Sequence, residues 1–417
     1  MRKFLLASLL FLLPAAAQAQ DTGVLSQWVQ LSAGGGSEAR IVTSAAICPA
    51  LTVDGASLPT TERAAPSSYF PVRLCSAQIP FSAKSASLNG VALPLFHQYP
   101  KRIMVFGDTG CRIKGTTIQD CNDPKAWPFA TIAAQAAAMK PDLVVHVGDY
   151  LYRESPCPDG NAKCAGSPYG DNWPTWAADF FTPAAPLLTA SPFVFVRGNH
   201  EDCARAGLGW MRLLGPLAFD PVAGCAGHMP LYSVPLGNVN LAVMDNADAD
   251  DTSIDHDLLD EYKADFAALA KMNTPPLWLA MHRPIWGAVT VKVLGVEMGA
   301  GGNQTMIASL PTTHPLDHVS LMLAGHIHTF EAMNYRKKLP AAIVAGFGGD
   351  ALDVAPPNLA GVNLSGTTVK DGLSLGGFGF LMMVREQSAW RIDVYRVDGT
   401  IQERCKFALR HLHCEKV

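Results

Sequence analysis

Five short apolar runs, each followed at once by polar side chains, constrain the fold of this chain more than any other feature of its sequence. The runs are four to six residues long and alternate with longer Ala-rich segments, which is typical of βαβ units around a buried sheet. They cover residues 103–106, 143–147, 193–196, 277–281 and 319–324. We therefore predict an α/β domain that begins after Pro100.

The residues that follow these runs carry oxygen and nitrogen donors. They read Gly107-Asp108-Thr109-Gly110, Gly148-Asp149-Tyr150-Leu151-Tyr152, Arg197-Gly198-Asn199-His200-Glu201, His282 and Gly325-His326-Ile327-His328. Because the carboxyl ends of strands in an open α/β sheet meet at one edge, we expect five separate segments to bring these side chains together. Asp, Asn, His and Tyr suit hard or borderline cations, and there are enough of them for two ions. Two adjacent ions favour hydrolysis of a phosphate ester, since one can polarise a phosphoryl oxygen while a shared hydroxide attacks in line.

The same five segments, in this order, resemble the signatures of the purple acid phosphatase branch of the calcineurin-like metallophosphoesterases. The shared patterns are GD-x-G, GD-x-x-Y, GNH-E, a strand that ends in His, and GH-x-H, and the resemblance covers roughly Lys101 to Tyr395. It implies the four-layer α/β/β/α sandwich of that family. The N-terminal part also resembles the β-sandwich that many of these enzymes carry, although no individual residues match there.

The resemblance also implies a role for each residue of the motifs. The implied ligands are Asp108, Asp149, Tyr152 and His328 for a ferric ion, and Asn199, His282 and His326 for a second ion, which would be Fe, Zn or Mn. Asp149 would bridge the two ions, and His200 would protonate the leaving oxygen or hold the phosphate. Other branches place a histidine two residues after the first aspartate. Gly110 occupies that position here, so the resemblance assigns the missing ligand to Tyr152.

The expected activity is hydrolysis of small phosphomonoesters by a hydroxide that the metals hold, with no covalent phosphoenzyme. A phosphodiesterase of the same fold is an alternative, because the metal core handles both esters and the surrounding loops select between them. A catalytically silent phosphate-binding or adhesion module is a further alternative, which the intact ligand set disfavours. The segment from Trp286 to Gln304 is expected to line the entrance to the site.

Several positions near the motifs allow two interpretations. Asp245 follows another apolar run and is either a site residue or structural support. Arg283 either reaches phosphate or lies on the surface, and Glu201 is expected behind the ligands or in a loop. The glycine-rich segments 346–350 and 372–379 lack both the P-loop Lys-Ser/Thr and the Rossmann spacing, so we interpret them as turns.

The N-terminus has the pattern of a secretory signal. Met1-Arg2-Lys3 is followed by an apolar run over residues 4–13 and by small residues that end at Ala19, where we predict cleavage. The apolar run is far shorter than the roughly 20 residues that span a membrane, so no membrane anchor is expected. We predict an exported protein, periplasmic or extracellular. The formal charge of −4 and the lack of a basic tract disfavour nucleic acid as the main partner.

Ten cysteines fit an exported chain, because disulfides persist in oxidising compartments. They fall as neighbours in loop-like stretches, which favours consecutive pairing, and no CxxC motif supports a zinc site. The predicted pairs are Cys48–Cys75, Cys111–Cys121, Cys157–Cys164, Cys203–Cys225 and Cys405–Cys414.

We divide the chain into a signal peptide over residues 1–19, a β-rich module over 20–98 and a metallophosphoesterase domain over 99–417. Within the domain, residues 127–140 are expected to form a helix, and Asp255 is expected to cap another that runs to Met272.

The predicted N-terminal module has short β-prone runs cut by turn residues. Examples are residues 39–43 and 69–74, and a Ser/Pro-rich loop is expected over 58–68. This pattern predicts a small β-sandwich.

Overall fold

The computed structural model of this 417-residue chain describes residues 23–272, 276–293, 296–311 and 316–415. The predicted signal peptide lies outside these ranges. Within them, none of the helices combines the length and the apolar character that crossing a membrane would require.

The first large sheet contains the three runs that precede the first three motifs. Its strands, in spatial order, are β27 (His411–Glu415), β26 (Ile401–Ala408), β25 (Ala389–Arg396), β24 (Gly379–Glu386), β9 (Arg102–Phe106), β12 (Leu143–His146), β13 (Phe193–Phe195), β1 (Val24–Leu31), β2 (Ser37–Thr43), β6 (Arg73–Gln78) and β5 (Thr61–Ala64). Strands β9, β12 and β13 are parallel, so their carboxyl ends lie at one edge.

The second large sheet contains the two runs that precede the last two motifs. Its strands, in spatial order, are β14 (Tyr232–Pro235), β15 (Asn240–Val243), β16 (Leu277–Ala280), β19 (Val319–Ala324), β21 (Ala341–Ala345), β20 (Phe330–Tyr335), β23 (Thr367–Leu375) and β22 (Asn363–Leu364). Strands β15, β16, β19 and β21 are parallel to one another. The strand–helix alternation expected after Pro100 has therefore produced two sheets.

The alternation of side chains along each central strand sets the order of the layers. On β9, Ile103 and Val105 join the apolar core between the two sheets, whereas Met104 and Phe106 join the core under the helices. On β19, Leu321 and Leu323 likewise face the first sheet. Because both faces of each sheet are covered, the central strands consist mainly of apolar residues.

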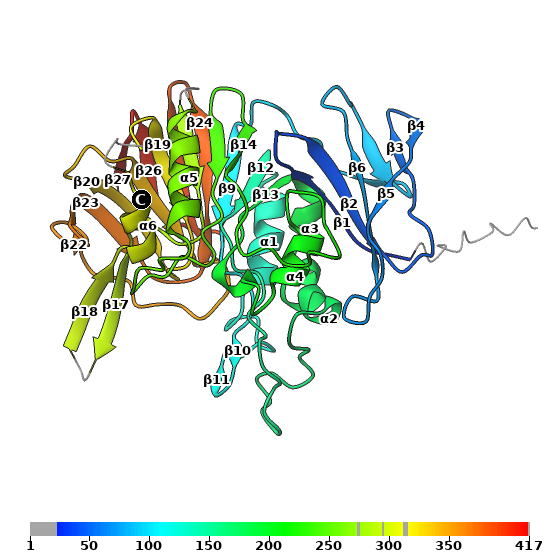
Figure 1. Ribbon diagram of the computed structural model, residues 1–417, viewed down its shortest axis with the longest axis horizontal. Coiled ribbons are helices and arrows are strands. Elements are labelled where there is room, and N and C mark those ends of the chain that lie inside the picture. The colour runs from blue at the N-terminus through cyan, green and yellow to red at the C-terminus, as the bar shows by residue number, and fades with distance from the viewer. Residues whose placement is uncertain (1–22, 273–275, 294–295, 312–315, 416–417) are drawn as a thin grey trace, which may run out of the picture.

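Helices cover the two outer faces (Figure 1). Those on the first sheet are α1 (Phe129–Ala138), α2 (Trp173–Trp176), the π-helical turn η1 (Ala177–Phe181), α3 (Thr182–Ala190) and α4 (Gly207–Leu213); those on the second are α5 (Leu259–Ala270) and α6 (Gln304–Ser309). The result is the α/β/β/α arrangement that the resemblance implies.

The N-terminal strands form a second apolar core of their own. A four-stranded sheet consists of β4 (Ala56–Leu58), β3 (Leu51–Val53), β7 (Ala86–Leu88) and β8 (Val91–Ala92). Leu51 and Leu88 of this sheet pack with Val29 and Ile41 of β1 and β2. However, β1 also pairs in parallel with β13, so the first large sheet continues across the predicted division at residue 98.

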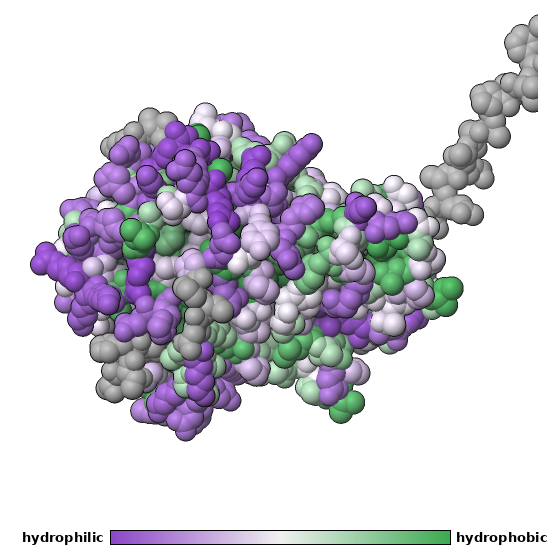
Figure 2. Space-filling view, turned by 90° about the horizontal axis from the view of Figure 1, so that it is seen from above, coloured by the Kyte–Doolittle hydropathy of each residue, from purple (hydrophilic) through white to green (hydrophobic). Residues whose placement is uncertain are grey.

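The surface of this N-terminal part is locally apolar. In Figure 2, hydrophobic residues are more frequent at the right end of the molecule, where Figure 1 places β3 to β6, than over the polar left part. Exposed apolar side chains of this part include Ile47, Tyr69 and Val91.

Three expectations about local structure need correction. Helix α5 begins at Leu259, because the carboxylate of Asp255 accepts the N–H of Asp257 in a turn and does not cap the helix. Strand β6 begins only at Arg73, after a proline and the exposed Tyr69. The stretch predicted as a loop over 58–68 contains β5, which pairs with β6.

Five disulfides join the pairs predicted from the cysteine spacing, which confirms the consecutive scheme. Two hairpins project near the predicted site, β10 (Ile113–Lys114) with β11 (Thr117–Ile118), and β17 (Ala288–Val293) with β18 (Val296–Gly301). The second hairpin occupies most of the segment from Trp286 to Gln304.

Candidate metal centre

All five predicted motifs lie just beyond strands of the two large sheets. Asp108, Asp149 and Asn199 follow β9, β12 and β13 of the first sheet, and Asn199 opens the short 3-10 helix η2 (Asn199–Glu201). His282 and His326 follow β16 and β19 of the second sheet. The parallel strands of both sheets therefore direct their motifs to one shared edge.

The backbone at this edge is strained. Asp108, Asp149 and His326 have positive φ angles of 57°, 60° and 70°. Non-glycine residues in this region cost about 1–3 kcal/mol each and concentrate at functional sites, where the surrounding structure holds them in place. Three of the predicted ligands are thus held in conformations that free chains seldom adopt.

The first group of predicted ligands converges around a tyrosine hydroxyl. The Tyr152 Oη lies 2.8 Å from Asp149 Oδ2, 3.1 Å from Asp108 Oδ1 and 3.1 Å from His328 Nε2. His328 Nε2 also lies 3.2 Å from Asp108 Oδ1. All four side chains are buried. The structure therefore brings together the whole set assigned to the first ion.

The second group converges around His282. Its Nε2 atom lies 3.0 Å from Asn199 Oδ1 and 3.2 Å from Asp149 Oδ2, while its Nδ1 donates to the Val147 carbonyl at 2.8 Å. This backbone contact fixes the ring so that Nε2 points at the site. His326 joins Asp149 and His282 in a cluster whose donor atoms all lie within 4.8 Å of one another.

Asp149 belongs to both groups. Within the described part of the chain, Asp108, Asp149 and His328 form a second cluster that also has its donor atoms within 4.8 Å. The pKa of Asp149 is raised by burial, but the neighbouring His282 and His200 outweigh this and hold it well below its usual value. A buried carboxylate that stays ionised between two donor sets fits a bridge between two cations.

The surroundings of Tyr152 also indicate a bound cation. Burial, together with the charges of Asp149 and Asp108, raises the pKa of Tyr152 well above its usual value. Its phenol therefore stays protonated unless a positive ion stabilises the phenolate. The donor set thus fits the predicted metal pair.

Gly110 lies directly against the Tyr152 ring. A Cβ atom at residue 110 would lie 2.9 Å from the Tyr152 ring and 2.6 Å from the Tyr150 carbonyl. A histidine at position 110 is therefore excluded by this backbone, and the Tyr152 ring lies against the glycine in its place. Gly198 is similarly constrained, because a Cβ there would meet Asp149 Oδ1 at 2.1 Å.

Comparison with known proteins assigns the chain to a family. The sequence model of the calcineurin-like phosphoesterases matches residues 101–330, which is more than half of the chain. The chain belongs to the calcineurin-like phosphoesterase family. Purple acid phosphatase 23 of Arabidopsis thaliana is 23% identical over 307 residues, covering 68% of this chain and 60% of that protein. The chain therefore spans about 60% of the length of this relative.

Two solved structures share the fold. The purple acid phosphatase PPD1 from yellow lupin (Lupinus luteus) seeds has a TM-score of 0.58 at 13% identity, over 91% of this chain and 73% of its own. A structure of PhoD has a TM-score of 0.55 at 12% identity, over 96% and 94% of the two chains. These likenesses confirm the predicted fold class and the resemblance to the purple acid phosphatase branch.

In this member of the family, His200 is held beside the two groups of candidate ligands. Its Nδ1 lies 2.7 Å from Glu154 Oε1, and its Nε2 lies 3.9 Å from Asp149 Oδ2. Its backbone N–H donates to Asp149 Oδ1 at 2.9 Å. The side chain lines a cavity of about 410 Å³ together with several of the predicted ligands, Asp149, Asn199, His326 and His328.

Glu201 connects two motifs of the candidate site through hydrogen bonds. Its carboxylate accepts the N–H groups of Tyr150 at 2.8 Å, Leu151 at 3.1 Å and Gly198 at 3.2 Å. Burial, and then the charge of Asp149, raise the pKa of Glu201 to about 8. Glu201 therefore supports the ligand loops from behind, as the sequence allowed.

Four supporting residues were not identified from the sequence. Asp251 lies 2.8 Å from His326 Nε2, and Asp350 lies 3.2 Å from His328 Nδ1 and pairs with Arg112. Glu154 contacts His200 as described above. Glu154 lies only two residues beyond Tyr152 and could have been noticed, but Asp251 and Asp350 are distant in sequence from the histidines they contact.

The two ambiguous charged residues have structural partners. Asp245 accepts from Arg197 Nη1 at 3.2 Å and from the Met229 N–H at 3.1 Å, so it supports the segment between β13 and β14. Arg283 pairs with Asp251 and donates from Nε to the Ala247 carbonyl at 3.1 Å. Both side chains are engaged with protein groups.

Proposed function

We propose that this chain is a binuclear metallophosphatase that hydrolyses phosphomonoesters. The observation that carries the proposal is the sharing of Asp149 between two clusters of donor atoms at the end of both sheets. When bound, a metal pair supplies Lewis acidity and an activated water for in-line attack on phosphorus. Family membership, a purple acid phosphatase relative and the intact motifs support this assignment.

The ligand set that we propose follows the motifs. Asp108, Asp149, Tyr152 and His328 would hold Fe(III), and Asn199, His282 and His326, with Asp149 shared, would hold a divalent Fe, Zn or Mn ion. Oxygen-rich donors and a phenol suit the harder ferric ion, whereas the two imidazoles suit the borderline divalent ions.

His200 is the proposed general acid. Hydrolysis breaks the bond between phosphorus and the alcohol oxygen, forms one from a water oxygen, and delivers a proton to the departing alcohol. Glu154 lies beside Nδ1 of His200, which leaves Nε2 on the side of the ligands and the cavity. His200 would therefore donate the proton from Nε2.

We also propose that the mature chain begins after Ala19 and works in the periplasm or outside the cell. Five disulfides support this location, because such bonds persist in oxidising compartments.

Metal analysis of the purified chain, combined with rates on phenyl phosphate and diphenyl phosphate, tests the proposal. We expect close to two metal ions per chain and a large preference for the monoester. A preference for the diester would replace the phosphatase with the phosphodiesterase alternative. A fully metal-loaded protein with no activity on either ester would contradict both.

A further inference from the structure

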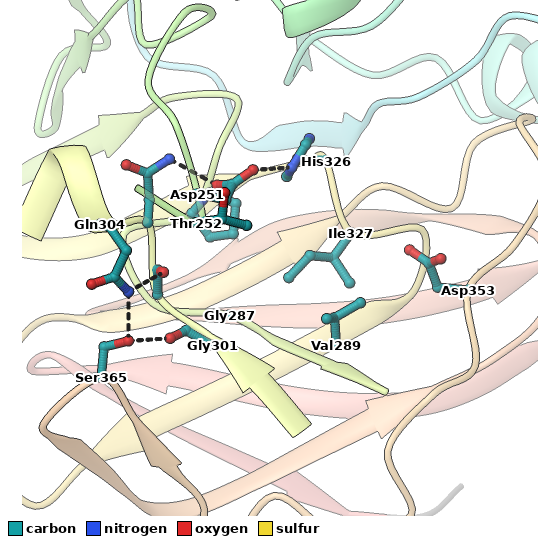
Figure 3. Close-up of a pocket in the computed structure, with 13 residues that line it drawn as sticks. Asp251, Thr252, Gly287, Val289, Gly301, Gln304, His326, Ile327, Asp353 and Ser365 are labelled. Atoms are coloured by element: carbon teal, nitrogen blue, oxygen red, sulfur yellow. Dashed lines mark hydrogen bonds and ion pairs between the residues drawn. The ribbon is translucent and has the colours of Figure 1, made fainter. Parts of the chain in front are cut away.

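A cavity of about 600 Å³ adjoins the candidate metal centre (Figure 3). It shares the lining residues His326 and Asp353 with the cavity that His200 lines, so the two cavities are direct neighbours. Its volume lies within the range of small-molecule sites. An organic group attached to a phosphate at the metal centre can therefore extend into this larger cavity.

The walls of the cavity include apolar side chains from the β17–β18 hairpin and from the loop between β19 and β20. Val289 comes from the β17–β18 hairpin, and Ile327 lies between two of the predicted ligands. Figure 3 shows these two side chains next to each other on one side of the cavity. Gly287 and Gly301 line the cavity with their backbone atoms.

The polar groups of the cavity already have partners within the protein. Gln304 donates to the Gly302 carbonyl at 3.2 Å and to Ser365 Oγ at 3.0 Å, as Figure 3 shows. Asn303 donates to the Ala249 carbonyl at 3.0 Å. These groups shape the cavity, and its ligand would be recognised mainly by fit and apolar contact.

The charges around the cavity are acidic. Asp251 and Asp353 line it, and among the described lining residues there is no lysine or arginine. The neighbouring Arg283 is paired with Asp251. Arg283 offsets the charge of Asp251, but no lysine or arginine lines the cavity to offset Asp353. A leaving group that carries further phosphates would therefore meet like charge at Asp353.

We propose that this cavity is the leaving-group subsite, and that it selects phosphomonoesters of uncharged, ring-sized alcohols over polyphosphates. This inference rests on the proposed phosphomonoesterase activity. Val289 is the specificity-determining residue, since its side chain faces the cavity from an element that supplies none of the predicted ligands.

Val289→Trp tests the subsite by filling it. Phenyl and 2-naphthyl phosphate have leaving groups of similar reactivity and different size. We expect Val289→Trp to lower kcat/KM for the naphthyl ester by roughly tenfold or more and to change the phenyl ester much less. Val222→Trp, at a side chain that is 94% exposed, is the matched control and should change neither. An unchanged naphthyl-to-phenyl ratio in Val289→Trp would overturn the subsite.

Binding of 2-naphthol, followed by its fluorescence, separates this inference from the proposed function. Weaker binding to Val289→Trp than to the full-length wild type would support the cavity even if no ester is hydrolysed. Equal binding would overturn it, even for an active phosphatase. If the metal-loaded wild type hydrolyses no phosphomonoester, that result would instead contradict the proposed function.

Val289→Lys provides a second variant in case the tryptophan disturbs folding. A lysine in the cavity supplies the missing cation, so kcat/KM for inorganic pyrophosphate relative to phenyl phosphate should rise severalfold. A ratio equal to that of the wild type would contradict the assigned electrostatic selection.

Discussion

The His200 ring is fixed by its neighbours before any substrate arrives. Its centroid lies 3.8 Å from that of the Tyr152 ring, and Glu154 holds Nδ1. We expect His200→Ala to lower turnover by roughly 10²–10⁴ on poor leaving groups such as phenol and by less on 4-nitrophenol, which needs little protonation. Steady-state rates on both esters, with metal content measured in parallel, check this. Equal losses on both esters, or loss of metal, would remove His200 from the role of acid.

Tyr152 is the residue on which the branch assignment depends most. A phenolate bound to Fe(III) should give a visible charge-transfer band, and no other proposed ligand would do so. Tyr152→Phe keeps the ring that fills the space beside Gly110 but removes the hydroxyl. We expect the iron-loaded variant to lose the band and part of its activity, while Asp108, Asp149 and His328 retain some metal. Absorption spectra decide this, and a band that survives in the variant would make Tyr152 a packing residue.

On the scale of elements, Glu331 links β20 to the β17–β18 hairpin. Its Oε2 accepts the Ala288 N–H at 3.0 Å, and its carboxyl is fully buried. Burial raises the pKa of Glu331 to about 8, the Asp353 charge adds to this, and the Ala288 N–H opposes it. The folded state thus binds this proton more tightly than the unfolded chain does, so this group makes the protein less stable as pH rises from about 4.5 to about 8.

Glu331→Gln should remove that dependence. We expect its Tm to exceed that of the wild type by roughly 2–4 °C at pH 8.5 and to match it near pH 4.5. Glu415→Gln, at an exposed side chain, is the control and should follow the wild type throughout. Parallel Tm curves for Glu331→Gln and the wild type across this pH range would show that the carboxyl is ionised in both states.

The central strands and the convergence of the candidate ligands were predictable for the same reason. A strand buried on both faces is a continuous apolar run, so β19 matches its predicted range of 319–324, and each ligand motif is a local pattern at the end of such a run. The start of α5 was mispredicted because Asp255 forms a local turn that competes with capping. Asp251 and Asp350 were missed because only tertiary packing brings them to the histidines.

At the scale of the whole molecule, the N-terminal strands and the helical layer are joined by buried polar contacts. Gln30 Nε2 donates to the Leu214 carbonyl at 2.9 Å, just beyond α4, and Arg212 of α4 donates to the Val72 carbonyl at 3.1 Å. Together with the pairing of β1 and β13, these contacts attach the N-terminal part to the layer that carries the first three motifs. We infer that the two parts unfold together.

Arg40 tests this coupling most directly. Its fully buried guanidinium donates to the Leu213 and Gly215 carbonyls, both at 2.7 Å, and pairs with Glu38 at 2.8 Å. Arg40→Ala removes the cation beside the buried Glu38 carboxylate and the donor to the Leu213 carbonyl, whereas the Gly215 carbonyl keeps Arg63 as a donor. We therefore expect a loss of about 3–5 kcal/mol in the free energy of unfolding. Arg73→Ala, which breaks a partly exposed ion pair, should cost less than about 1 kcal/mol.

Denaturant unfolding followed by both tryptophan fluorescence and circular dichroism measures the effect of Arg40→Ala. If the contacts couple the two parts, the wild type gives coincident transitions, and Arg40→Ala separates them because the N-terminal strands detach first. Coincident transitions and an unchanged midpoint in Arg40→Ala would mean that the contacts of Arg40 do not couple the two parts. In that case the Arg40 contacts would not join the parts of the chain on the two sides of the predicted division at residue 98.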